Sequence, residues 1–159
     1  MRSCPIAFRE CTPFGVHIML ALMEKLLALH RYYIWANRLR EHFDSAISTL
    51  TASAPPEAVF IDDRGLFLSH WYAALFVVVE GWQEVQLSDP EINTLLSSPN
   101  VDLLRRFRNG VCHYQRNYND PRFLDLVQAQ GVVPWVRQLN LAFGRYFLQK
   151  LAPSAGATP

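Results

Sequence analysis

The strongest constraint on the fold is a long stretch, residues 17–49, that contains neither glycine nor proline. Its apolar side chains recur at steps of three and four residues, which is the spacing of one face of an α-helix. They are Leu22, Leu26, Leu29, Tyr33, Ala36, Leu39, Phe43 and Ile47. A helix of this length needs other elements to cover its apolar face, so the stretch predicts a fold built around one long helix.

A second long helix is expected over residues 63–86. Asp62 and Asp63 offer an N-terminal cap for it. Its centre, residues 71–79, is apolar on nearly every side, which is typical of a helix deep in a bundle or at a subunit interface. Because residues 77–79 are three consecutive valines, a short β-strand is the competing prediction there.

Proline and capping residues divide the remainder of the chain into shorter units. They predict short helices over residues 90–97 and 121–129, and longer ones over 99–118 and 133–151. The sequence therefore predicts an all-α fold: a helical bundle of four long helices plus one or two short helices. It forms a single domain, residues 14–151, between an irregular leader, residues 1–13, and a disordered tail, residues 152–159.

Composition limits what this bundle can do. Hydrophobic residues make up 50% of the chain and charged residues only 18%, which excludes a largely disordered protein and makes an oligomer plausible. The net charge of +1 argues against a broadly basic surface, so any contact with nucleic acid must come from a local patch. The cysteines, Cys4, Cys11 and Cys112, are odd in number and have no metal-type spacing. With no signal peptide and no apolar run long enough to span a bilayer, we expect a soluble cytoplasmic protein without a metal or cofactor.

The helix expected at 99–118 carries the residues most able to do chemistry. Its buried stripe is expected to be Leu104, Phe107, Val111, Tyr114 and Tyr118. At about 100° per residue, Asn109 and His113 then lie one turn apart on the face away from the core. Arg105, Arg106, Arg108 and Arg116 surround them. Gly110 lowers helix propensity here, which suggests that something approaches the helix closely.

Such a strip suits cleavage of a phosphodiester without a metal. Histidine titrates near neutral pH, so His113 could take a proton from a ribose 2′-hydroxyl or give one to the leaving oxygen. Arg108 could hold the phosphate and stabilise charge in the transition state. One chain supplies a single imidazole of this strip, whereas two copies across a two-fold axis would supply both an acid and a base.

The string Arg108-Asn109-x-x-x-His113 resembles the R-x4-6-H motif of the HEPN superfamily, in which a polar residue often follows the arginine. The resemblance implies a bundle of four or five helices that frequently dimerises through the motif helices. It also implies metal-independent endoribonuclease activity in many members, among them toxins of toxin–antitoxin pairs and antiviral effectors. Carried over, Arg108 and His113 match the catalytic pair and Asn109 the supporting position, while Arg105, Arg106 and Arg116 would contact substrate. An antitoxin or nucleotidyltransferase partner is possible on the same grounds.

Two alternatives stay open: a non-catalytic HEPN-like module, and a helical bundle whose apolar central helix serves only assembly. Some HEPN members are non-catalytic and bind nucleotides, RNA or a protein partner. One toxin subgroup has a modified tyrosine two residues after the histidine, and here that position is Gln115. Glu80 and Glu84, one turn apart, either face solvent or pair with the arginines, since no His or Asp at matching spacing suggests a metal site.

Overall fold

The computed structural model describes residues 13–48 and 62–152, and every regular element in these ranges is helical. The helices are α1 (Pro13–Ser48), α2 (Asp63–Glu84), α3 (Pro90–Leu96), α4 (Asn100–Cys112), α5 (Pro121–Gln128) and α6 (Val132–Leu151). The predicted all-α fold is therefore confirmed, and the three valines at 77–79 lie within α2 rather than in a strand. The leader before Pro13 and the tail after Ala152 lie outside the described residues.

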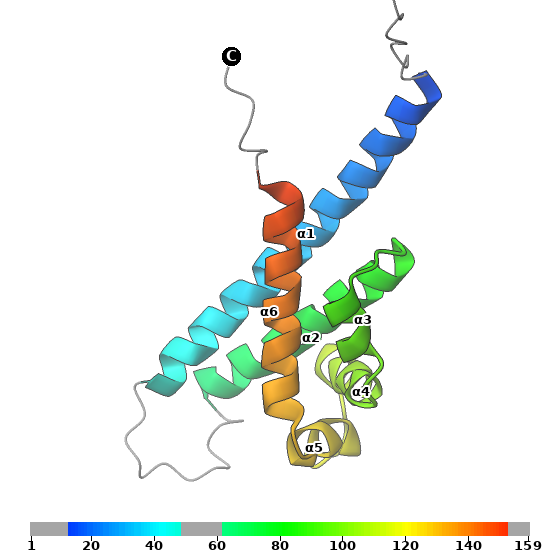
Figure 1. The fold of residues 1–159 in the computed structure, drawn as a ribbon. Coiled ribbons are helices and arrows are strands. Elements are labelled where there is room, and N and C mark those ends of the chain that lie inside the picture. Colours follow the sequence, from blue (N-terminus) through cyan, green and yellow to red (C-terminus); the bar gives the residue numbers. More distant parts are fainter. Residues whose placement is uncertain (1–12, 49–61, 153–159) are drawn as a thin grey trace, which may run out of the picture.

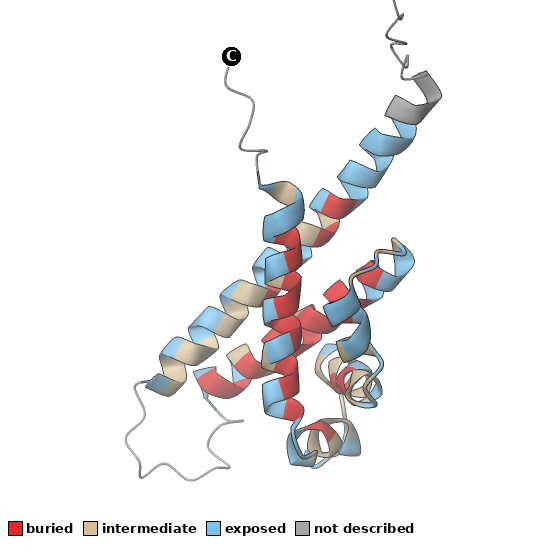
Figure 2. Ribbon diagram, in the orientation of Figure 1, coloured by how far each residue is buried: buried red, intermediate tan, exposed pale blue. Residues whose placement is uncertain are grey.

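The helices are arranged around α2, which packs against α1 on one side and α4 on another. In Figure 1, α6 crosses α1, while the shorter helices lie beside the lower half of α6. α5 packs on α4, and α3 packs on α6. Figure 2 shows that the buried residues gather along α2 and α6. This arrangement leaves the carboxyl end of α4, which carries the motif, between α2 and α5.

Packing explains why α2 is apolar on most sides. Its buried residues include Trp71, Leu75, Val78, Val79 and Trp82, each no more than 2% exposed. By length and composition alone, α2 is long and apolar enough to cross a membrane. The core helix of a bundle meets the same criteria, and 56% of the most apolar 18-residue segment of α2 is buried here.

Local signals set the starts of α2, α3 and α5. The carboxylates of Asp62, Asp89 and Asp120 each accept a hydrogen bond from a backbone N–H in the first turn of α2, α3 and α5. The prediction for the start of α1 was wrong, because this helix begins at Pro13 rather than near residue 17. A proline is compatible with the first turn, where its missing N–H would have had no partner within the helix.

An ion-pair cluster ties α1 to α6. Asp44 lies 2.6 Å from Arg137 Nη2 and 2.5 Å from Arg40 Nη1. Burial alone would raise the pKa of Asp44, but hydrogen bonds and charge from Arg137 and Arg40 outweigh it and hold this pKa below its ordinary value of 3.8. Because the folded state favours the carboxylate, it contributes stability at neutral pH that is lost as pH falls from about 3.8 through the lower folded pKa.

We therefore expect Asp44→Asn to lower the free energy of unfolding by about 1 kcal/mol at neutral pH, since the pair is only partly buried. The difference from wild type should vanish below the folded pKa, where Asp44 is protonated in both states. Urea titrations at neutral and at strongly acidic pH check this. Asp125→Asn is the control, because its pair with Arg106 is more exposed. A loss of equal size at both pH values would contradict the assignment.

Candidate functional site at the end of α4

α4 ends at Cys112, six residues before the predicted end. His113 is its C-cap and has an extended backbone, with φ −129° and ψ 136°. Tyr114 and Tyr118, expected in the buried stripe, are 91% and 76% exposed. That part of the prediction was wrong because α4 has already ended at Cys112. Tyr114 and Tyr118 therefore lie in the turn that leads to the Asp120 cap of α5. His113 is thus placed by the turn after α4, not by a helical face shared with Asn109.

Arg108 faces α2. Its Nη2 forms an ion pair with Glu80, and its Nη1 donates to Asn109 Oδ1 at 3.1 Å. The guanidinium carbon lies 5.3 Å from the centre of the Phe76 ring, a cation–π distance. The Nε atom is buried and has no hydrogen-bond partner among the described residues. Arg108 is therefore a largely sequestered cation with one donor still unsatisfied.

The surroundings of His113 differ from those of Arg108. His113 is exposed, and its ring has no hydrogen-bond partner within the described residues. The Gln115 side chain donates to the carbonyl of His113 at 2.6 Å and holds the turn back toward α4. The imidazole is thus accessible to a ligand, while the hydrogen bond from Gln115 holds the backbone of His113 in place.

A cavity of about 620 Å³ opens beside His113, between the turn and α5. Aromatic rings from Tyr114, Tyr118 and Phe123 line it, with amides from Gln115 and Asn117. None of its lining residues is Asp, Glu, Lys or Arg. Such a lining suits a flat, uncharged group with hydrogen-bonding edges, because rings offer stacking faces and amides offer both donors and acceptors. Sequence reasoning missed the two tyrosines because their spacing matched a buried stripe.

Within one chain, Arg108 and His113 have different neighbours, and Arg108 does not line the cavity beside His113. Arg108 contacts Phe76 and Glu80 of α2, whereas the cavity beside His113 reaches Ser69.

The flanking arginines are mostly paired with acids of their own chain. Arg105 pairs with Asp102 and Arg106 with Asp125, while Arg116 is exposed in the turn after α4. The sequence left open whether Glu80 faces solvent or pairs with an arginine, and the structure shows that it pairs. Its partner Arg108 could not be identified from sequence, since 28 residues separate them. Cys112, the last residue of α4, is exposed.

The close approach predicted at Gly110 is made by α5. A Cβ added there would lie 3.1 Å from Phe123 Cζ and 3.3 Å from Arg122 Cβ. Glycine at this position therefore lets α5 pack directly on α4, and it positions one wall of the cavity.

We expect Gly110→Val to lower the free energy of unfolding by about 1–3 kcal/mol, because the branched side chain must push Phe123 aside. Arg105→Val is the matched control: it places the same residue at an exposed position of α4 and should cost much less. Thermal melts of both variants check the prediction. An unchanged or raised melting temperature for Gly110→Val would mean that the better helix propensity of valine over glycine, rather than contact with α5, decides the effect.

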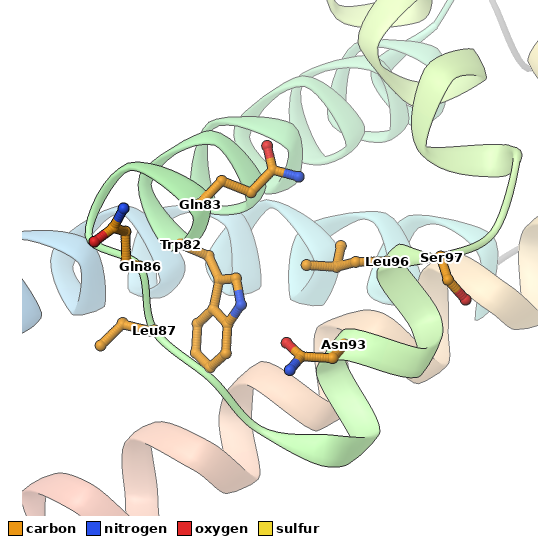
Figure 3. A pocket seen from close by; sticks show the side chains of 7 residues that line it. All are labelled: Trp82, Gln83, Gln86, Leu87, Asn93, Leu96 and Ser97. Carbon is orange, nitrogen blue, oxygen red and sulfur yellow. The ribbon is translucent and has the colours of Figure 1, made fainter.

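A second hollow, of about 540 Å³, lies between the end of α2 and α3 (Figure 3). Trp82, Asn93 and Leu96 border it, and no ionisable side chain lines it. Trp82 is 2% exposed and packs edge-on against Phe143 and Tyr146. The wall of this hollow that Trp82 forms is therefore the outer surface of the hydrophobic core. In the described ranges, no three His, Cys, Asp or Glu side chains are grouped to hold a metal ion.

Comparisons with family models, curated proteins and solved structures found no match to this chain. The resemblance to HEPN domains therefore rests on the residues around the end of α4.

Proposed function

We propose that this chain is a HEPN-like domain that binds single-stranded RNA or a nucleotide at the end of α4. The observation that carries the proposal is the cavity beside His113, whose rings and amides suit an unpaired base. Proteins recognise single-stranded RNA mainly by stacking splayed bases on aromatic side chains and by hydrogen bonds to base edges. A base in the cavity would leave its phosphate outside, where His113 and Arg116 are exposed.

Electrostatics limit the affinity of this site. Arg105, Arg106 and Arg108 are each neutralised by an acid, and the chain carries a net charge of only +1. Phosphate contacts normally supply much of the affinity for nucleic acid. The site therefore suits selective recognition of a base with modest affinity, rather than tight binding to any nucleic acid.

Metal-independent endoribonuclease activity of a homodimer is the second candidate. It is favoured by the exposed imidazole of His113, which can transfer a proton, and by the unsatisfied Nε of Arg108. It requires a second copy to complete the site, because one chain supplies a single imidazole of the motif and the reaction needs both an acid and a base. A toxin or defence role, with an antitoxin or nucleotidyltransferase as partner, would belong to this candidate.

Incubation of the full chain with single-stranded RNA in EDTA tests both candidates. Fluorescence anisotropy measures binding, and a denaturing gel shows whether the RNA stays intact. Binding without cutting, weakened by Tyr114→Ala, supports the first proposal. Cutting that His113→Ala reduces by a hundredfold or more, with an unchanged melting temperature, supports the second. A protein that neither binds nor cuts any single-stranded sequence would overturn both.

Glu80 is expected to compete with phosphate for Arg108. Glu80→Gln should therefore tighten RNA binding by roughly threefold to tenfold, because a phosphate no longer has to displace a carboxylate. Glu84→Gln is the matched control: it makes the same change in charge one turn further along α2. Titrations at two salt concentrations measure both variants. Equal tightening by the two would show that only net charge matters.

A further inference from the structure

The first turns of α1 extend past the rest of the bundle (Figure 1). Every residue from 17 to 25 is exposed, as the blue upper part of α1 in Figure 2 shows. Five of them are large and apolar, and each is 43–63% exposed: Ile18, Met19, Leu20, Leu22 and Met23. An apolar helix end of this kind normally contacts another molecule.

The exposed apolar residues continue down α1 on the side away from the core. Leu20, Met23, Leu27 and Ile34 form this α1 stripe, with steps of three, four and seven residues. These are the positions that two paired helices use at their shared seam. Each member is 43–57% exposed, whereas Leu26, Leu29 and Ala36, which face the bundle, are at most 8% exposed.

Two charges flank the α1 stripe on one side. Glu24 and Arg31 lie seven residues apart, so they occupy equivalent positions of successive heptads. Neither forms an ion pair with another described residue of its own chain, although the Arg31 guanidinium stacks on Tyr32 and Trp35. If two α1 helices pair antiparallel about a point between residues 27 and 28, each Glu24 meets the partner copy's Arg31. A parallel pair would place Glu24 and Arg31 of the two copies on opposite sides of the seam, where they could not pair.

We propose that the α1 stripe is a homodimer interface, in which it pairs antiparallel with the α1 stripe of a second copy. The charge pattern is self-complementary only in this arrangement, as a two-fold axis requires. The four stripe residues offer roughly 400 Å² of apolar surface per copy, which suits a weak, reversible interface smaller than the roughly 800 Å² of standard size. α2 separates this surface from α4, so the proposal is independent of RNA binding.

Sedimentation velocity of the full chain over a range of concentrations tests the interface. Leu27→Glu should weaken self-association at least tenfold, because it places a charge at the centre of the seam. Leu141→Glu is the matched control: this leucine of α6 is 57% exposed, against 51% for Leu27, and lies outside the stripe. Circular dichroism should show both variants folded. Equal behaviour of the two variants would overturn the proposal.

Charge reversal tests the antiparallel orientation. Glu24→Arg and Arg31→Glu should each weaken association, since each places two like-charged pairs across the seam. The double variant should restore it toward the wild-type value. Single variants that associate as well as wild type would overturn the antiparallel assignment. A wild-type chain that stays monomeric and instead sediments with anionic vesicles would overturn the whole proposal in favour of a lipid surface.

Discussion

Replacing Asn140 by alanine is expected to lower the free energy of unfolding by about 3 kcal/mol. Asn140 is 1% exposed and lies where α1, α2 and α6 meet. Its Oδ1 accepts from Trp71 Nε1 at 3.1 Å, and its Nδ2 donates to Asn37 Oδ1 at 3.0 Å. Alanine removes both bonds and leaves the indole N–H buried without a partner, which is the costly outcome for a polar group in a core.

Urea denaturation of Asn140→Ala measures this loss. Gln138→Ala is the control on the same helix, because its side chain is exposed and should change stability by no more than about 0.5 kcal/mol. A double-mutant cycle of Asn140→Leu with Trp71→Phe isolates the bond itself. The double variant should be at least about 1 kcal/mol more stable than the sum of single losses predicts, because it leaves no orphaned partner in this bond. Simple additivity would contradict the proposed network.

Removing the guanidinium of Arg108 is expected to weaken RNA binding about tenfold or more. Arg108 is the one arginine of α4 held by α2, with Phe76 beneath it and Glu80 and Asn109 at its edge. These contacts fix the orientation of its guanidinium, so a phosphate that displaces Glu80 would find the N–H donors of Arg108 already oriented. Stability should change little, since the Glu80 carboxylate left behind is exposed to solvent.

The test compares Arg108→Gln with Arg105→Gln. Both variants remove one positive charge from α4, but Arg105 is paired locally with Asp102 and is exposed. Anisotropy titrations with the same RNA should show the larger loss for Arg108→Gln, together with a shallower dependence on salt. Identical losses would mean that Arg108 acts only through net charge.

The order of helices and most of their starts could be predicted because the signals are local. Asp62, Asp89 and Asp120 cap the helices that follow them, and Pro90 and Pro121 begin two of those helices. Each signal acts within a few residues and needs no knowledge of the fold.

The end of α4 could not be predicted, because it depends on a neighbour. Tyr114 and Tyr118 continue the helical spacing of Leu104 and Phe107, but only the latter two meet other helices. Spacing shows which residues could share a face and not whether anything covers that face. For the same reason the spacing placed Asn109 and His113 on one helical face, whereas the structure ends α4 at Cys112, before His113. The pairing of Arg108 with Glu80 is likewise a contact between distant segments.

Chemical-shift mapping of the backbone amides with a single-stranded RNA oligonucleotide tests the central claim most directly. If the end of α4 is the ligand site, the largest shifts should fall in the turn that carries His113, Gln115 and Asn117, and on the face of α5 that carries Phe123. Shifts confined to the hollow of Figure 3 or to α1, or no shifts at saturating RNA, would contradict the account.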